Sequence, residues 1–193
     1  MYGVPVIATG DILREAVAEG SELGRLAEGY MKRGELVRDD IVITIMEDRL
    51  DEPDVEDGFI LDGFPRSFRQ AEALDRILKE KKVELDAVLN VVASSDTIVG
   101  RLSLRRSCPK CGAVYHMKDM PPKDDEICDE CRSSLIQRDD DKVEIIRHRL
   151  EVYEKQTFPI LERYETAGKA KEVRGELPID QIPDEVKRVL GDP

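Results

Sequence analysis

The sequence contains no hydrophobic run long enough to cross a membrane, and it does not start with a basic stretch, an apolar segment and a small-residue cleavage site. We therefore expect a cytoplasmic protein without a membrane partner. Basic residues are fewer than acidic ones: the sequence has 30 Lys and Arg residues and 42 Asp and Glu residues, which gives a net charge of -12. This balance argues against a nucleic-acid partner, whose phosphates attract basic surfaces.

Histidine is nearly absent, with only His116 and His148 in the chain. We expect His116 to be structural and His148 to lie on a solvated helix face. We find no Ser–His or Cys–His pair of the kind that activates a nucleophile. The sequence also lacks internal repeats and low-complexity tracts.

Apolar and amphipathic segments alternate along most of the 193 residues. Short apolar segments at 4–8, 59–61, 87–92 and, more weakly, 169–173 predict buried parallel strands. Helical spacing predicts helices at 11–17, 22–32, 39–50, 67–78, 142–166 and 182–190, with caps at 39–40 and a kink at Pro159. The alternation indicates one α/β domain, with an open parallel sheet covered by helices on both faces.

Ligands of such sheets bind beyond the carboxyl ends of the strands, and two polar turns, 9–11 and 62–66, fall at such ends. Arg66 follows a proline in the second turn, and an arginine there favours an anionic ligand. Asp62 is either a turn cap or a carboxylate that holds a magnesium-bound water. Gln70 is equally well explained as the capping-box partner of Ser67.

Residues 104–141 break the alternation and contain all four cysteines, Cys108, Cys111, Cys128 and Cys131. The cysteines form two C-x2-C pairs, and two such pairs supply a closed shell of four thiolates. We therefore predict a small insertion held together by a structural metal. Four free or redox-active thiols are the other interpretation, which the double-pair spacing disfavours.

Several stretches, taken in order, resemble the adenylate kinase family of the long-lid bacterial and archaeal type with a zinc knuckle. They are TGDILREAV, GELVRDDIV, GFILDGFPRS with Gln70, RLSLRRSCPKCG, CDEC, QRDDD and RHRLEVYEKQT. The resemblance covers nearly the whole chain and rests on the order and spacing of these stretches. It implies a P-loop nucleoside monophosphate kinase fold over 1–193 that converts MgATP and AMP reversibly to two ADP. It also implies an AMP-binding arm at 8–37, a metal-binding lid inserted at 104–141, and a monomer.

The resemblance further implies roles for individual residues. The AMP pocket would be lined by Thr9, Arg14, Leu36, Val37, Gly63, Phe64, Pro65, Arg66 and Gln70. The ATP and the transferred phosphoryl group would be held by Arg101, Arg105, Arg138 and Arg149, with Arg66 and Asp62 also in the catalytic site. Gln70 would read the adenine edge, and the cofactors would be structural zinc and the Mg2+ that accompanies ATP. Leu104 departs from the family, which often has glycine there.

The phosphate loop of that family, G-x-x-x-x-G-K-S/T, has no match in the sequence, because the nearest fit, Gly24 to Gly29, is followed by Tyr30 and Met31. The family places this loop after a first strand that would precede residues 4–8. We therefore expect an N-terminally truncated kinase domain whose sheet lacks its central strand. Such a chain should be poorly stable and nearly inactive, although its AMP site is mostly present.

Other functions stay open on the sequence alone. The first is a kinase for another nucleoside monophosphate. Gln70 and the backbone at Leu36–Val37 favour adenine as the base and so argue against it. The second is a non-catalytic, AMP- and zinc-binding truncated paralogue, which the missing loop supports and the retained arginines oppose. A zinc-ribbon protein that binds nucleic acid is disfavoured by the net charge.

Overall fold

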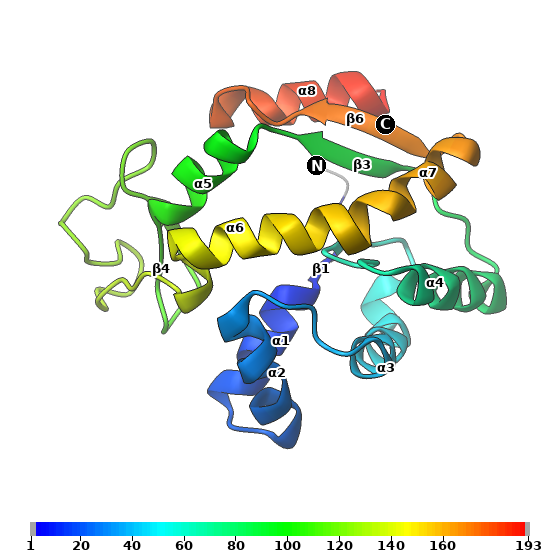
Figure 1. Cartoon of the computed structure of the whole chain (residues 1–193), viewed down its shortest axis with the longest axis horizontal. Helices are drawn as coiled ribbons and strands as arrows, with labels where there is room; N and C mark the ends of the chain where they lie inside the picture. The colour runs from blue at the N-terminus through cyan, green and yellow to red at the C-terminus, as the bar shows by residue number, and fades with distance from the viewer. Residues whose placement is uncertain (1–2, 192–193) are drawn as a thin grey trace.

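The parallel strands form two separate pairs rather than one continuous sheet (Figure 1). The computed structural model describes residues 3–191. Strand β1 (Val6–Ala8) pairs with β2 (Ile60–Asp62), and β3 (Val88–Val92) pairs with β6 (Ala170–Arg174). The predicted α/β class and parallel pairing are therefore confirmed, and within residues 3–191 the sheet is divided into two pairs, as expected of a sheet that lacks its central strand.

Each strand of the two parallel pairs has one edge without a strand partner among residues 3–191. Ile7 of β1, which lies opposite Leu61 of β2, is buried. Val91 of β3, in the other pair, is 58% exposed. The prediction that these strands are buried is therefore wrong for part of their length. The reason is that a strand is shielded by its neighbours in the sheet, and each of these strands has only one.

The predicted insertion contains a third pair, in which β4 (Arg105–Ser107) runs antiparallel to β5 (Val114–His116). An isolated bridge joins Ser107 to Ile136 and connects the two ends of the insertion. Cys108, Cys128 and Leu135 form a small buried cluster of their own. The insertion therefore has its own local core, separate from that of the rest of the chain.

Helices form most of the remaining structure. The α-helices are α1 (Thr9–Ala18), α2 (Glu22–Arg33), α3 (Asp39–Leu50), α4 (Phe68–Lys81), α5 (Ser95–Ser103), α6 (Val143–Val152), α7 (Phe158–Thr166) and α8 (Ile182–Leu190), and the 3-10 turns are η1 (Pro53–Val55), η2 (Asp139–Asp141) and η4 (Ile179–Gln181). In Figure 1, α6 crosses between the β3–β6 pair and α1 with α2. None of the helices in the described part of the chain has both the length and the apolar composition needed to span a membrane.

Two local predictions near the helix starts are wrong. The expected polar turn at 9–11 is the first turn of α1, which follows β1 directly, because Thr9 and Leu13 lie on one buried face of the helix. Asp39 and Asp40 do not cap α3 from outside but lie in its first turn, after Arg38 at the cap position. Carboxylates in the first turn still favour the helix, since its amino end carries partial positive charge.

The long helix predicted over 142–166 is interrupted earlier than expected. Between α6 and α7 the chain makes a π-helical turn, η3 (Tyr153–Thr157), and Pro159 follows in the first turn of α7. Because proline has no N–H to donate to the preceding turn, the backbone widens ahead of it. This widened turn faces the cavity described below, which Tyr153 and Thr157 help to line.

A buried carboxylate fixes the last helix against the sheet. Glu185 of α8 is only 4% exposed and accepts hydrogen bonds from Arg188 and from Arg174 of β6. The hydrogen bonds from Arg188 and Arg174 hold the pKa of the Glu185 carboxyl well below its usual range. The pair of guanidinium groups therefore keeps this buried charge ionised and ties α8 to β6.

A glycine sets the distance between α1 and α2. Gly24 is buried, and a Cβ built there would collide with the backbone carbonyl of Ala16. Ser21 caps α2 by accepting the Gly24 N–H at 3.0 Å and donates to the Ala16 carbonyl at 2.9 Å. The helices therefore pack as closely as their backbones allow.

We predict that Gly24→Ala lowers the free energy of unfolding by about 1–3 kcal/mol, because the added methyl group must push α1 away from α2. Gly29→Ala in the same helix is the matched control, since its Cβ would meet only the flexible end of Arg33. That change should be neutral or stabilising by up to about 1 kcal/mol through helix propensity. Urea denaturation of both variants measures the difference, and equal effects would contradict the close-packing interpretation.

Candidate functional site

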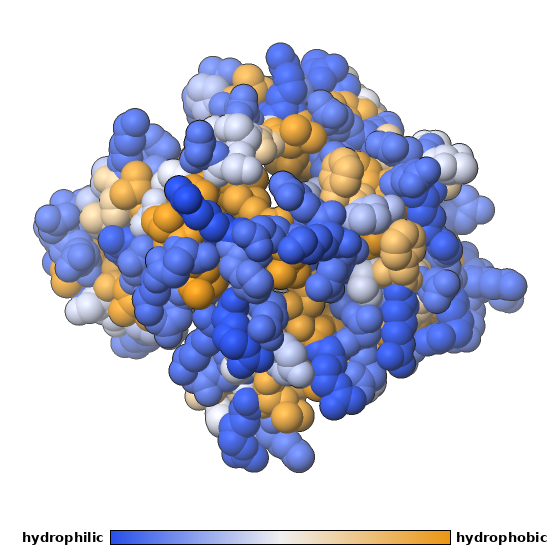
Figure 2. All heavy atoms as spheres, viewed as in Figure 1, coloured by the Kyte–Doolittle hydropathy of each residue, from blue (hydrophilic) through white to orange (hydrophobic). Residues whose placement is uncertain are grey.

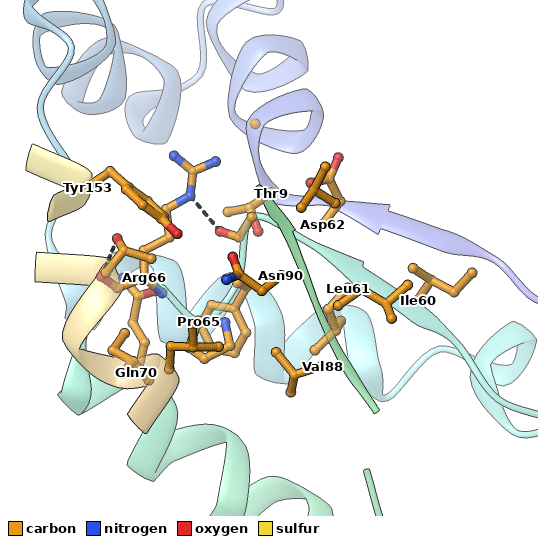
Figure 3. Close-up of a pocket in the computed structure, with 18 of the residues that line it drawn as sticks. Thr9, Ile60, Leu61, Asp62, Pro65, Arg66, Gln70, Val88, Asn90 and Tyr153 are labelled. Atoms are coloured by element: carbon orange, nitrogen blue, oxygen red, sulfur yellow. Dashed lines mark hydrogen bonds between the residues drawn. The ribbon is translucent and has the colours of Figure 1, made fainter. Parts of the chain in front are cut away.

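A cavity of 1490 Å³ is lined by residues of β2 and β3, of α6 and α7, and of the first helices. Figure 2 shows hydrophobic residues in the hollows near the middle of one face, with hydrophilic residues around them. In the close-up of Figure 3, Arg66, Pro65 and Gln70 lie together on one side, and Ile60, Leu61 and Val88 on another. The cavity thus has a polar side and an apolar side.

All the residues predicted to line an AMP pocket border this one cavity. They are Thr9, Arg14, Leu36, Val37, Gly63, Phe64, Pro65, Arg66 and Gln70, and Asp62 and Arg149 also line it. Arg101, Arg105 and Arg138 are not among its lining residues. The structure therefore brings together most of the predicted site from segments that lie far apart in the sequence.

The turn after β2 is shaped around Arg66. Gly63 has φ of +75°, and the Phe64–Pro65 peptide bond is cis. A Cβ at Gly63 would lie 2.5 Å from Nη2 of Arg66, so a side chain there would displace the guanidinium group. The Nε–H of Arg66 donates to the Gly63 carbonyl at 2.9 Å, which holds the side chain back over its own turn.

The backbone of Arg66 is held from two other elements. Its N–H donates to Oε1 of Gln70 at 2.7 Å, and its carbonyl accepts from the hydroxyl of Thr157 at 3.0 Å. Thr157 belongs to the π-helical turn η3, whose widened backbone brings this hydroxyl to the turn. Figure 3 shows Arg66 beside Tyr153 of the same turn. Arg66 is therefore positioned by α4 and η3 together.

Gln70 does not act as the second half of a capping box. Ser67 caps α4 as predicted, because its hydroxyl accepts the Gln70 N–H at 3.2 Å. The Gln70 side chain, however, accepts from the Arg66 N–H and donates from Nε2 to Oδ1 of Asp39 at 2.7 Å. The capping-box prediction for Gln70 is thus wrong, since these two partners use its amide instead.

Three of the predicted site arginines, Arg66, Arg101 and Arg138, make no salt bridge within residues 3–191, in contrast to most arginines of the chain. Arg101 donates to backbone carbonyls instead. Burial lowers the pKa of Arg66, and the nearby charges of Arg149 and Arg14 lower it further, against the opposing effect of Asp62. Burial also lowers the pKa of Arg138, with Arg14 and Arg105 adding to it. Arginines held together in this way attract an anion.

The remaining predicted arginines are already engaged. Arg105 forms a bidentate pair with the fully buried Asp141, at 2.9 and 2.6 Å. Arg149 donates to the Asp140 carbonyl at 3.0 Å and to its carboxylate at 3.2 Å. Arg101 donates to the carbonyls of Gly175 and Leu177, the second at 2.9 Å. These contacts hold α5, η2 and α6 next to the cavity.

The four cysteines lie together in the insertion. Their sulfur atoms all lie within 4.8 Å of one another, and they form no disulfide. The two C-x2-C turns have the same backbone hydrogen bond, from Gly112 N–H to Cys108 and from Arg132 N–H to Cys128. Both Gly112 and Arg132 have positive φ, so Arg132 adopts a backbone conformation that favours glycine. The donor set fits one metal ion in a closed four-thiolate shell.

The acidity of one thiol supports metal binding. Hydrogen bonds from Ser133 lower the pKa of Cys131 to about 6, whereas the pKa of Cys111 in the same cluster is raised to about 12. His116 is not part of the cluster, because its Nδ1 accepts the Asp119 N–H at 3.0 Å. His148 is 45% exposed, as its predicted place on a solvated face requires.

Comparison with known proteins identifies the family to which this chain is similar. The family model described as "Adenylate kinase" matches residues 1–169. The chain belongs to the adenylate kinase family. The adenylate kinase of Archaeoglobus fulgidus is 51% identical over 189 residues, which cover 98% of this chain and 87% of that protein.

Bacterial relatives are nearly as similar. The adenylate kinase of Acetivibrio thermocellus is 49% identical over 189 residues, covering 98% of this chain and 87% of that protein. The adenylate kinase of Thermotoga maritima is 46% identical over 190 residues, covering 98% and 86%. The resemblance seen in the sequence is therefore confirmed at the level of the family.

Sequence reasoning missed three residues of this adenylate kinase site. They are Asp39, which contacts Ser67 and Gln70, Thr157, which contacts Arg66, and Asn90, a polar residue of β3 that lines the cavity. Asn90 had a signal, because it is the one polar residue within an otherwise apolar strand. Asp39 and Thr157 had none, since only the fold brings them to the turn.

We predict that Thr157→Val weakens the binding of AMP about tenfold or less, because the Arg66 carbonyl loses a hydrogen bond worth about 1 kcal/mol and the turn loosens. Thr157→Ser keeps the hydroxyl and should bind normally. Thr166→Val is a matched control, since its hydroxyl bonds only to Glu162 in the exposed end of α7. Calorimetric titration with AMP measures all three, and an unchanged affinity in Thr157→Val would contradict the role given to η3.

Proposed function

We propose that this protein binds AMP in the cavity and takes part in the adenylate kinase reaction, the reversible transfer of a phosphoryl group between ATP and AMP to form two ADP. The observation that carries the proposal is the pair Arg66 and Arg138, two arginines without carboxylate partners, beside Arg14. An anion that enters the cavity, which Arg66 and Arg14 both line, would offset the repulsion between these two arginines. The AMP phosphate is the anion that the family membership supplies.

The proposed chemistry needs no covalent nucleophile. Transfer of a phosphoryl group depends on holding the two nucleotides in line and on neutralising the charge of the transferred group. Arg66, with the backbone of 63–66 and Arg14, would hold the AMP phosphate. Arg101, Arg105, Arg138 and Arg149 would face the ATP and the transferred group. Mg2+ would accompany ATP, and Asp62 at the end of β2 would hold one of its waters.

We further propose that residues 104–141 form a lid and residues 8–37 an AMP-binding arm. Two contacts of Gln137 support a hinge, because its Nε2 donates to the Ser103 carbonyl at 3.0 Å and to the Asp141 carbonyl at 3.2 Å. These two carbonyls stand at the two ends of the insertion. Closure of a lid over the cavity would exclude water, which would otherwise accept the phosphoryl group.

We propose zinc as the ion of the four-cysteine site. Four thiolates in a closed shell suit Zn2+ and leave no position for catalysis, so its role would be to hold the lid together. Reduced thiols in this number support a cytoplasmic location, where disulfides are rare. A monomer is the assembly that we propose, in keeping with the resemblance.

A second candidate is a protein that binds AMP and zinc without catalysis. The 193 residues contain no G-x-x-x-x-G-K-S/T stretch, which would cradle the ATP phosphates with backbone N–H groups and a lysine. Phosphoryl transfer is therefore measured separately from AMP binding.

The test of the proposed function combines binding with turnover. Calorimetry should show that AMP binds, and that Arg66→Gln weakens binding by at least about tenfold, through loss of a charge-assisted contact. Arg69→Gln is the matched control, because Arg69 is exposed on α4, three residues further along. Phosphorus NMR of ATP with AMP then reports ADP formation. No AMP binding would overturn the proposal, whereas binding without turnover selects the second candidate.

We predict one zinc ion for each chain, as measured by elemental mass spectrometry. Cys128→Ser should release the zinc and lower the melting temperature, because Cys128 is fully buried in the core of the insertion. His116→Asn should retain one zinc, since His116 is outside the cluster. A zinc content unchanged in Cys128→Ser, or lost in His116→Asn, would contradict the four-cysteine site.

A further inference from the structure

Asp39 holds the amide of Gln70 in a single orientation. Its Oδ1 accepts from Nε2 of Gln70 at 2.7 Å and from the hydroxyl of Ser67 at 2.8 Å. The other end of the amide, Oε1, accepts the backbone N–H of Arg66 at 2.7 Å. Gln70 is only 2% exposed, so solvent does not compete for these bonds. No other orientation of the amide satisfies both partners.

A rotated amide would face two wrong partners. Exchange of the oxygen and nitrogen of Gln70 would bring Oε1 against the Asp39 carboxylate, where two acceptors repel each other. It would also bring Nε2 against the Arg66 N–H, where two donors meet. Because an unmade hydrogen bond in a buried site is costly, the rotated state is disfavoured by both contacts together.

The fixed amide still has bonding capacity toward the cavity. Nε2 carries two hydrogens and Oε1 two lone pairs, and one of each is used by Asp39 and Arg66. Gln70 lines the cavity, so the remaining hydrogen and lone pair are available to a ligand there. A donor and an acceptor side by side match the edge of adenine, which presents an amino group beside a ring nitrogen.

We propose that Asp39 is the residue that makes this site select adenine over a 6-oxopurine. Hypoxanthine presents an acceptor oxygen and an N–H donor where adenine presents a donor and an acceptor. A freely rotating glutamine would pair with either base by turning over, whereas Gln70 cannot turn while the Asp39 carboxylate is in place. Asp39 acts through Gln70 and is therefore a positioning residue.

The position of Asp39 in the fold gives this restraint a second consequence. Asp39 opens α3 directly after residues 36–38, at the end of the proposed AMP-binding arm, and its partners Ser67 and Gln70 open α4. The same carboxylate therefore joins the arm to the helix that bears the base-reading amide. Correct docking of this segment and correct orientation of Gln70 depend on one another.

The test compares AMP with IMP as ligands, and it rests on the proposed function. The two nucleotides differ in their base edge and share their phosphate. Calorimetric titration of the wild type should show tighter binding of AMP. In Asp39→Asn, which keeps the shape and removes the charge, the preference for AMP over IMP should fall about tenfold, as expected when one charge-assisted hydrogen bond is lost. Asp40→Asn is the matched control, because Asp40 is exposed and pairs with Arg38.

A second measurement is independent of nucleotide binding. In the 15N-labelled protein, the side-chain amide protons of Gln70 should exchange with water at least about tenfold more slowly in the wild type than in Asp39→Asn, because both restraints must release before they exchange. Those of the exposed Gln137 should not change. Failure of the wild type to bind AMP would reject the proposed function, and the exchange rates would then decide on Asp39 alone.

The role of Asp39 would be overturned by either of two results. One is that Asp39→Asn weakens the binding of AMP and the binding of IMP by the same factor, as expected if the carboxylate only stabilises the fold. The other is that Gln70 exchanges equally fast in the wild type and in Asp39→Asn. A lower melting temperature of Asp39→Asn with an unchanged ratio of the two affinities would also count against it.

Discussion

The candidate site depends on a partly buried guanidinium group, that of Arg66, which makes no salt bridge within residues 3–191. Removal of Arg66 from water and the nearby charges of Arg149 and Arg14 both disfavour its protonated form, and the lowered pKa expresses this. An ordinary core would pair such a charge or leave it in solvent. Here the fold keeps it without a carboxylate partner at the edge of a cavity, and we propose that a bound anion stabilises it.

The surrounding structure holds that charge in place without neutralising it. The contacts to Arg66 come from carbonyl, amide and hydroxyl groups of Gly63, Gln70 and Thr157. Gln70 and Thr157 hold the backbone of Arg66, the Gly63 carbonyl fixes the direction of its side chain, and all three leave its charge intact. The carboxylates of Asp140 and Asp141 are occupied by Arg149 and Arg105 instead. The arrangement separates positioning of the arginine from its electrostatic attraction for a ligand.

Local patterns in the sequence predicted the parts of the structure that depend on neighbouring residues. Helix ends at Ser67 and Gly34 follow from capping and from the left-handed turn that glycine permits, and the cysteine spacing predicted the cluster. The family resemblance pointed to the residues that line the cavity. What escaped prediction was long-range: the contacts of Asp39 and Thr157, which lie 31 and 91 residues from their partners Gln70 and Arg66. The exposure of Val91 also escaped, because burial of a strand is decided by its neighbours and not by its own residues.

The most direct test of the uncompensated arginine is nitrogen NMR of the arginine side chains, with AMP and adenosine as the two ligands. AMP should shift the Nε–H resonance of Arg66, which lines the cavity, while adenosine, which lacks the phosphate, should leave it in place. Arg174, paired with Glu185 at the far side of β6, should respond to neither. Equal shifts with the two ligands, or none with AMP, would contradict the claim that this charge is held for an anion.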